Sequence, residues 1–269
     1  MNNLSRLLRA ARAAEGYPAY FPVRLHALPE ATSWVSGGRL TPAALAAARK
    51  GVVMTVKRSP DRQFMYTESG VPDRLPTSAT EVGARTEFLD MDPTEFVRAC
   101  ELQDGTTPPF HYYTCGVKLH APSFDEQACP GWQRLVVDDS AAAHRHSTPA
   151  HSSMWVGGKG STTQAHYDVL NNIFVQVYGR KRFRLWGPQA HAMLRVFPDA
   201  HPRARKARVL VDGCSTVLAP PEVDVTLEAG QALFIPAFWF HHVEALSCSV
   251  SVNVFSENAI KHAEHADVC

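Results

Sequence analysis

The C-terminal part of this chain is a series of short β-type runs with no helix-length apolar segment between residues 205 and 255. Each run is rich in β-branched or aromatic residues and ends at turn-forming residues, a pattern typical of a sandwich or jelly roll. A βαβ sheet would need a helix between successive strands. The predicted strands are 111–119, 154–156, 173–178, 181–186, 223–227, 232–235 and 247–255. We therefore predict an α+β chain that is mainly β, with flanking helices.

Residues 1–107 mix helix, strand and loop signals. Thr41-Pro42 and Asp92-Pro93 each combine an N-cap residue with a proline suited to the first helical turn, so each pair predicts the start of a helix. A short strand is expected at 52–57, and irregular chain at 18–38.

The domain organisation follows from the change between mixed signals in the N-terminal part and short β-type runs in the C-terminal part. No internal repeat is visible, and no linker divides the chain into independent units. We expect 1–107 to form a mixed layer packed on the core, 108–258 to form the β core, and 259–269 to be a C-terminal tail.

Composition excludes several classes of protein. With 269 residues, 45% of them hydrophobic, the chain can bury a sizeable core, and its net charge of +1 provides no overall field for a polyanion. The six cysteines include no CxxC pair, which disfavours a structural zinc site and favours a reducing compartment. The longest apolar stretch, 232–240, is far shorter than the roughly 20 residues of a membrane helix, so we expect no membrane span.

The N-terminal residues 2–14 form a basic amphipathic pattern without acidic residues. Such a segment is typical of a mitochondrial transit peptide, but it also suits a surface helix that packs its leucines on the domain. We favour the surface helix and a cytoplasmic or nuclear location, with mitochondrial targeting as the alternative.

A metal site is indicated by His166 and Asp168, because positions i and i+2 of a strand share one face. Either His241 or His242 could supply a third ligand from a distant strand. Two histidines and one carboxylate leave three coordination positions open, the arrangement of non-haem Fe(II) oxygenases. In a chain with 13 histidines, the His-x-Asp pattern alone is weak.

Lys181 is the second chemical signal. Alternation along 181–186 places it on the same face as Phe183 and Leu185, so its ammonium points into the apolar interior, while Arg182 and Arg184 face water. A buried lysine without a partner is unfavourable. Either a bound carboxylate is that partner, or Lys181 frays at the preceding turn.

Two blocks of sequence carry a further signal. The first contains His166-Tyr167-Asp168, Asn172, Gln176-Val177, Gly179-Arg180-Lys181-Arg182 and Pro188. The second runs from Leu227-Glu228-Ala229-Gly230 through Phe234-Ile235-Pro236 to Trp239-Phe240-His241-His242-Val243. With these blocks the chain resembles the JmjC-domain, cupin-like 2-oxoglutarate oxygenases, most closely the small hydroxylase branch that contains tRNA wybutosine and asparaginyl hydroxylases. The resemblance covers about 110–256 and implies a double-stranded β-helix (jelly roll).

Site residues are implied by this resemblance position by position. The metal ligands match His166, Asp168 and His241, so His242 should point the other way. The cosubstrate's distal carboxylate would bind Lys181 and Thr163. The remaining cosubstrate contacts match Tyr113, with neighbouring Tyr112 as the alternative, and the amides Asn172 and Asn253.

The resemblance also implies the chemistry. We expect a dioxygenase that uses Fe(II), 2-oxoglutarate and O2, releases succinate and CO2, and takes ascorbate as a reductant in vitro. Hydroxylation is the first choice, with lysine or arginine N-demethylation by the same ligands as the alternative. A cupin that binds metal without oxidative turnover is the main competing class, and a metal-dependent isomerase or hydrolase is the third.

The substrate is expected to be a macromolecule, RNA or protein. The basic residues between 195 and 208 could meet RNA phosphates, or they could form a solvated loop outside the barrel. Monomer and homodimer both remain open.

Overall fold

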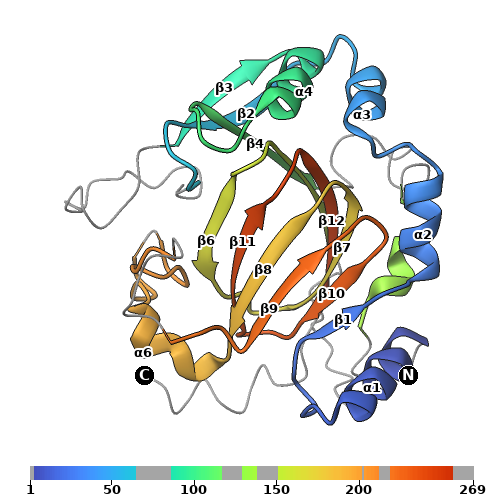
Figure 1. Cartoon of the computed structure of the whole chain (residues 1–269), viewed down its shortest axis with the longest axis vertical. Coiled ribbons are helices and arrows are strands. Elements are labelled where there is room, and N and C mark those ends of the chain that lie inside the picture. Colours follow the sequence, from blue (N-terminus) through green and yellow to red (C-terminus); the bar gives the residue numbers. More distant parts are fainter. Residues whose placement is uncertain are drawn as a thin grey trace.

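The computed structural model describes residues 3–64, 86–116, 129–137, 151–201, 203–211 and 219–256, and the predicted tail at 259–269 lies outside them. Two antiparallel sheets face each other and form the core (Figure 1). This arrangement confirms the mainly β prediction.

The larger sheet has eight strands. In spatial order they are β1 (Val23–Leu25), β10 (Ala232–Ile235), β7 (Asn171–Tyr178), β12 (Ser249–Ser256), β5 (His151–Gly157), β4 (Phe110–Gly116), β2 (Met54–Ser59) and β3 (Glu87–Met91). The smaller sheet contains β6 (Thr162–His166), β11 (Phe240–Ala245), β8 (Lys181–Trp186) and β9 (Val223–Leu227). Strands far apart in the sequence are thus neighbours in both sheets, such as β1 beside β10 and β6 beside β11, as in a jelly roll.

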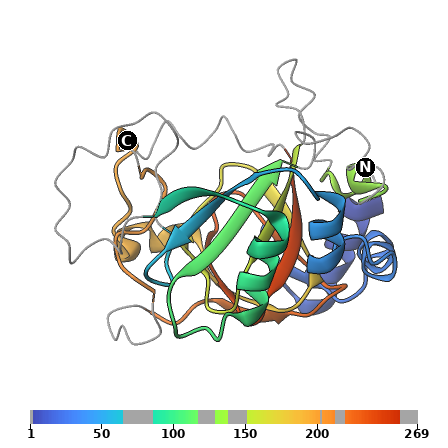
Figure 2. The ribbon, with the colours of Figure 1, turned by 90° about the horizontal axis from the view of Figure 1, so that it is seen from above.

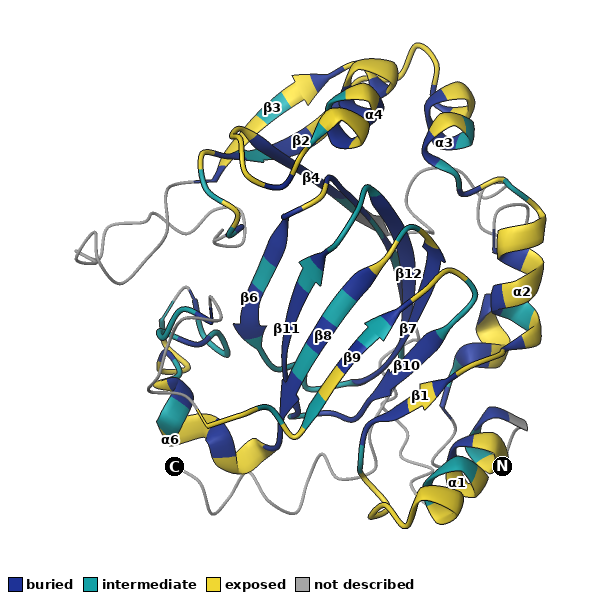
Figure 3. Ribbon diagram, viewed as in Figure 1, coloured by how far each residue is buried: buried dark blue, intermediate teal, exposed yellow. Residues whose placement is uncertain are grey.

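Helices cover the outer face of the larger sheet. They are α1 (Asn3–Glu15), α2 (Pro29–Ser36), α3 (Pro42–Ala48) and α4 (Pro93–Leu102), with the short turn η1 (Trp132–Leu135). Seen from above, α4 lies beside the strands β2 to β4 (Figure 2). Val250, Val252 and Val254 of β12 are fully buried on this face. Most of β12 is coloured as buried in Figure 3.

A second apolar cluster lies between the sheets. Phe183 and Leu185 of β8 pack there with Phe174 of β7 and Leu233 of β10. This cluster fills part of the barrel interior, and Phe174 also lines the cavity described below.

Several local predictions are confirmed. The side chain of Thr41 accepts a hydrogen bond from the backbone N–H of Ala44, and that of Asp92 accepts from the N–H groups of Thr94 and Glu95, so both residues are N-caps. The strands predicted at 181–186, 223–227 and 232–235 have those bounds.

The N-terminal half is more ordered than predicted. Residues 18–38 were expected to be irregular, but they contain β1 and α2, because β1 pairs with β10 and Trp34 of α2 is buried. Three strands of this half, β1, β2 and β3, belong to the larger sheet.

The N-terminal segment is a surface helix packed on the domain. Leu4 and Leu8 of α1 are only 5% and 1% exposed and belong to the core cluster, whereas Leu7 is 40% exposed. Among the described residues, no helix is long and apolar enough to span a membrane.

The basic segment after β8 lies outside the barrel, as expected. The turn η2 (Pro188–Ala190), the helix α6 (His191–Leu194) and the following chain pack on the outer face of the smaller sheet. Two details correct the sequence interpretation. Arg203 is buried rather than solvated, and Arg184 does not simply face water, because its Nη2 donates to the carbonyl oxygen of Val211 at 3.3 Å.

Candidate active site

The first two candidate ligands lie where β6 ends. His166 is the last residue of β6, and Asp168 lies in the loop between β6 and β7. The sequence argument placed both residues in one strand, which is wrong, because the strand pairing stops at His166. A hydrogen bond from the backbone N–H of Phe238 to the carbonyl oxygen of Asp168, 2.8 Å long, holds this loop instead.

Phe238 belongs to the short connection between β10 and β11. Its φ of 67° is in the left-handed region, which is unfavourable for a residue with a bulky side chain. The bond from its backbone N–H to the carbonyl oxygen of Asp168 helps to hold this conformation. The connection therefore couples the carboxylate loop to the start of β11.

The third candidate ligand comes from β11. His241 pairs with His166 across the two strands, and their ring centroids are 4.2 Å apart. His242 points to the outer face of the sheet, where its Nδ1 lies 3.4 Å from Nη2 of Arg184. The choice of His241 over His242 as the inward residue therefore agrees with the structure.

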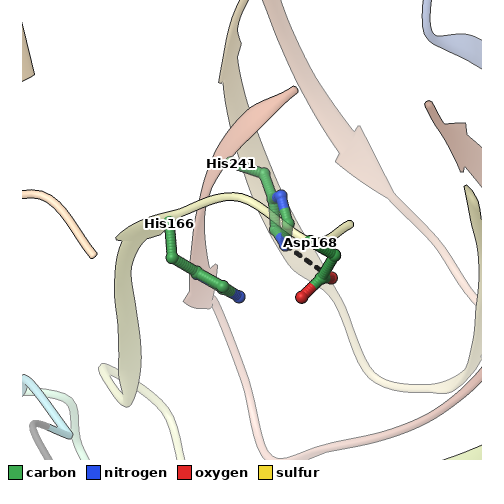
Figure 4. Close-up of side chains that lie close together, drawn as sticks. All are labelled: His166, Asp168 and His241. Carbon is green, nitrogen blue, oxygen red and sulfur yellow. Dashed lines mark ion pairs between the residues drawn. The ribbon is translucent and has the colours of Figure 1, made fainter. Parts of the chain in front are cut away.

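The three side chains converge on one point (Figure 4). One potential ligand atom from each of His166, Asp168 and His241 lies within 4.8 Å of the other two. Nε2 of His241 and Oδ2 of Asp168 are 3.6 Å apart, which is too long for a hydrogen bond. These two atoms approach one another without bonding directly.

Backbone carbonyls orient both imidazoles. Nδ1 of His166 lies 2.8 Å from the carbonyl oxygen of Gln164, and Nδ1 of His241 lies 3.1 Å from that of Trp239. Since a carbonyl only accepts, each Nδ1 carries a proton, which leaves Nε2 as the nitrogen that can bind a metal. Burial, together with the nearby His241, lowers the pKa of His166 to about 3, so this ring is neutral at neutral pH, as a metal ligand must be.

A β-bulge brings Thr163 into the same interior. His241 and Val243 are two positions apart on β11, but their partners His166 and Thr163 are three positions apart on β6. The additional residue lets both Thr163 and His166 line one cavity, although simple alternation would place them on opposite faces.

The cavity lies between the two sheets and opens to solvent. About 450 Å³ within it and at its mouth is free of protein atoms, part of which is open to solvent. Its walls are formed by Tyr112, Trp155, Thr163, His166, Asp168, Asn172, Phe174, Lys181, His241, Val243, Asn253 and Phe255. Seven of the eight site residues predicted from the sequence are therefore brought together.

Lys181 lies in this wall with only 2% of its surface exposed. Its Nζ lies 5.3 Å from the ring centroid of Phe174 and 5.9 Å from that of Tyr112, and no carboxylate among the described residues forms an ion pair with it. Burial lowers the pKa of Lys181 to about 7. An inward-facing ammonium of this kind is suited to an anionic ligand.

Tyr113 is the predicted site residue that does not reach the cavity. Its hydroxyl accepts a hydrogen bond from Nη1 of Arg49 on the opposite face of β4. Tyr112 lines the cavity in its place, and Gly157 makes room for it, because a Cβ there would lie 2.8 Å from Cδ2 of Tyr112. The two adjacent tyrosines were the alternatives in the sequence, and the structure selects Tyr112.

Asn172 and Asn253 line the cavity and are hydrogen-bonded to each other. Nδ2 of Asn253 donates to Oδ1 of Asn172 at 3.3 Å, and Oδ1 of Asn253 accepts from the indole N–H of Trp155 at 2.8 Å. Sequence analysis did not single out Trp155. The sequence contains no local signal for it, because its register with the inward-facing Ser251 is visible only in the strand pairing.

Lys57 is a second buried lysine that sequence analysis missed. It is the register partner of Tyr112, and its Nζ lies 5.9 Å from the centroid of that ring. Burial, with a smaller contribution from the positive charge of Lys206, lowers the pKa of Lys57 to about 7.

Comparison with known proteins identifies a family for most of the chain. A cupin-like domain matches residues 26–262. A tRNA wybutosine-synthesizing protein 5 from Danio rerio is 38% identical over 106 residues, which are 37% of this chain and 31% of that protein. A lysine-specific demethylase, JMJ31, from Arabidopsis thaliana is 29% identical over 124 residues, 43% of this chain and 23% of that protein.

The structural comparison gives a weaker likeness. YcfD, a ribosomal oxygenase from Escherichia coli solved with cobalt and succinic acid, has a TM-score of 0.45 and 14% identity, covering 89% of this chain and 49% of that one. The curated relatives match this chain over about a third of their own length or less.

Proposed function

The chain belongs to the cupin-like (JmjC) domain family, and from this membership we propose that it is an Fe(II)- and 2-oxoglutarate-dependent dioxygenase, a hydroxylase that releases succinate and CO2. The observation that carries the proposal is the convergence of His166, Asp168 and His241 in the same cavity as the buried ammonium of Lys181. Metal ligands alone would suit many cupins, but the inward lysine adds a binding position for an acid.

The metal site fits a divalent ion such as Fe(II). Two imidazoles oriented through their Nδ1 atoms and one carboxylate oxygen form a donor set on one side of a common point. The other side faces the cavity, which leaves room for exogenous ligands. Bound there, Fe(II) would supply the redox chemistry that activates O2 and drives the decarboxylation of 2-oxoglutarate.

The chain's own residues would bind and orient the cosubstrate. 2-Oxoglutarate carries a keto acid at one end and a carboxylate at the other. The cavity contains the metal ligands, which suit the keto acid end, and Lys181, which suits the carboxylate end. Lys181 would pair with the distal carboxylate, with Thr163 and Tyr112 as hydroxyl partners. Asn172 and Asn253 would provide amide donors along the wall, and the aromatic side chains would exclude water.

The substrate we propose is a macromolecule, a modified tRNA base or a protein side chain. The relatives named for wybutosine synthesis support RNA, and the relative named as a lysine-specific demethylase supports protein. Hydroxylation of a C–H bond and removal of an N-methyl group begin in the same way, so the same residues would serve both. We place the protein in the cytoplasm or nucleus.

Thermal unfolding with and without ligands tests the proposed class. A ligand that binds only the folded state raises the melting temperature. We expect 2-oxoglutarate to raise it when Mn²⁺ is present and to have little effect without metal, and His166→Ala to abolish the response. A protein that binds Mn²⁺ but ignores 2-oxoglutarate would be a metal-binding cupin or an isomerase, and the proposal would be wrong.

A further inference from the structure

Trp155 controls which atoms two neighbouring amides present to the cavity. It lies on β5, lines the cavity, and stacks on Tyr112 with ring centroids 5.9 Å apart. An indole N–H can only donate a hydrogen bond. Because it lies 2.8 Å from Oδ1 of Asn253, that amide must turn its oxygen toward Trp155.

The orientation of Asn253 then determines that of Asn172. With its oxygen turned to Trp155, Asn253 directs Nδ2 to the other side, where it donates to Oδ1 of Asn172 at 3.3 Å. The oxygen of Asn172 is thereby engaged, and its Nδ2 points elsewhere. No hydrogen bond from this Nδ2 is found within the described part of the chain, although Asn172 is only 3% exposed and lines the cavity.

The direction of these amides matters for the ligand. An asparagine offers a donor at one end and an acceptor at the other, and without a fixed partner it can rotate between the two. A carboxylate ligand accepts hydrogen bonds and is repelled by an amide oxygen. A wall that presents amide nitrogens therefore favours an anion, and one that presents amide oxygens disfavours it.

We propose that Trp155 is a positioning residue for the cosubstrate: through Asn253 it orients Asn172 so that amide N–H groups face a carboxylate of 2-oxoglutarate. The inference rests on the proposed function, because it names how one wall of the same site recognises its acid. Trp155 acts through the asparagines and not by a contact of its own with the reacting atoms.

Equilibrium binding of 2-oxoglutarate to the Mn²⁺-loaded protein, measured by calorimetry, tests this role without turnover. Trp155→Phe keeps an aromatic ring beside Tyr112 but removes the N–H, so Asn253 can rotate. We expect the dissociation constant to rise about three- to tenfold, the effect of one lost hydrogen bond. The KM for 2-oxoglutarate should rise similarly, with little change in kcat or in melting temperature.

Trp186→Phe is the matched control. Its indole N–H also donates one hydrogen bond, to the carbonyl oxygen of Ala219 at 3.0 Å, but it lies on the outer face of the smaller sheet. This variant should bind 2-oxoglutarate as the unaltered protein does.

A double-mutant cycle separates orientation from general damage. In an Asn172→Ala background, Trp155→Phe should have no further effect on binding, because the amide that it orients is gone. If Asn172→Ala fails to fold, Asn253→Ala serves in the same cycle. Unchanged 2-oxoglutarate binding by Trp155→Phe would overturn the positioning role of Trp155 but not the proposed function. The same holds if Trp155→Phe weakens binding by the full factor again in the Asn172→Ala background. Absence of metal-dependent 2-oxoglutarate binding in the unaltered protein would overturn the proposed function as well.

Discussion

Replacement of Lys181 by methionine should change stability and ligand binding in opposite directions. Lys181→Met keeps a long unbranched side chain between Phe174 and Tyr112 but removes the ammonium, which is 2% exposed. Without ligand, that buried charge destabilises the fold. With 2-oxoglutarate bound as we propose, the same charge would have a carboxylate partner.

The magnitude follows from the pKa. The drop from 10.5 in the unfolded chain to about 7 in the fold sets a ceiling of about 5 kcal/mol on the stability lost through burial of the charge. The Nζ atom faces a cavity open to solvent, so we expect Lys181→Met to raise the free energy of unfolding by about 1–3 kcal/mol at pH 7. Loss of the charge-assisted bond should weaken 2-oxoglutarate binding about 10- to 150-fold.

The sign of the pH dependence follows as well. Between pH 7 and 10.5 the unfolded chain binds more protons at this lysine than the folded chain, so the burial cost is fully present below pH 7 and is relieved as the pH rises. The stability gained by Lys181→Met should therefore shrink at alkaline pH. Lys57 contributes a similar slope to both proteins, so the difference between them isolates Lys181.

Urea unfolding of the ligand-free proteins at pH 7 and 9.5, with calorimetric titration of 2-oxoglutarate into the Mn²⁺-loaded forms, measures both effects. A Lys181→Met protein that is less stable than the unaltered one at pH 7 would show that Lys181 already has a satisfactory partner in the fold. Unchanged affinity for 2-oxoglutarate would refute its assignment to the cosubstrate carboxylate.

Three further variants test other parts of the structure. His241→Ala should lose Mn²⁺ binding in a calorimetric titration, whereas His242→Ala should retain it, because His242 faces Arg184 on the outer side; the reverse pattern would mean that the ligand register is wrong. Gly157→Ala places a Cβ 2.8 Å from Cδ2 of Tyr112 and should weaken 2-oxoglutarate binding while destabilising the fold by about 1–3 kcal/mol. Its control Gly158→Ala crowds Gln103 instead and should lower stability alone; equal binding by the two variants would contradict the role of Tyr112. Leu8→Ala should lower the free energy of unfolding in urea by about 2–4 kcal/mol and Leu7→Ala by less than about 0.5 kcal/mol, since only Leu8 is buried; similar losses would show that α1 packs differently.

Alternation of inward and outward side chains correctly predicted which residues face the barrel interior where the strand is regular. In β8 it placed Lys181 with Phe183 and Leu185 on the inner face, and this is confirmed. In β12 alternation separates Val250, Val252 and Val254 from Ser249, Ser251 and Asn253, but alternation alone cannot distinguish a cavity wall from the solvent side of an edge strand. The answer depends on long-range pairing, which places β12 between β7 and β5.

Local irregularities were beyond the reach of sequence periodicity. Thr163 reaches the cavity through a bulge, and Asp168 reaches it from a loop held by Phe238. The sequence prediction for Asp168 assumed instead that it shares a strand, and therefore a face, with His166. Tyr112 and Tyr113 are adjacent and chemically alike, so only the strand register decides which faces inward. Residues 18–38 have few local signals of structure, and β1 and α2 are stabilised by their packing on the core.

Our central proposal is that the three candidate metal ligands and the buried Lys181 together support an oxidation coupled to 2-oxoglutarate. The most direct measurement is succinate release from 2-oxoglutarate by the purified protein with Fe(II), O2 and ascorbate, beside His166→Ala, with and without total tRNA or a peptide pool. We expect iron-dependent release of succinate that His166→Ala does not show and that either the tRNA or the peptide pool increases. Succinate production that is absent, or equal in the unaltered protein and His166→Ala, would contradict the proposal.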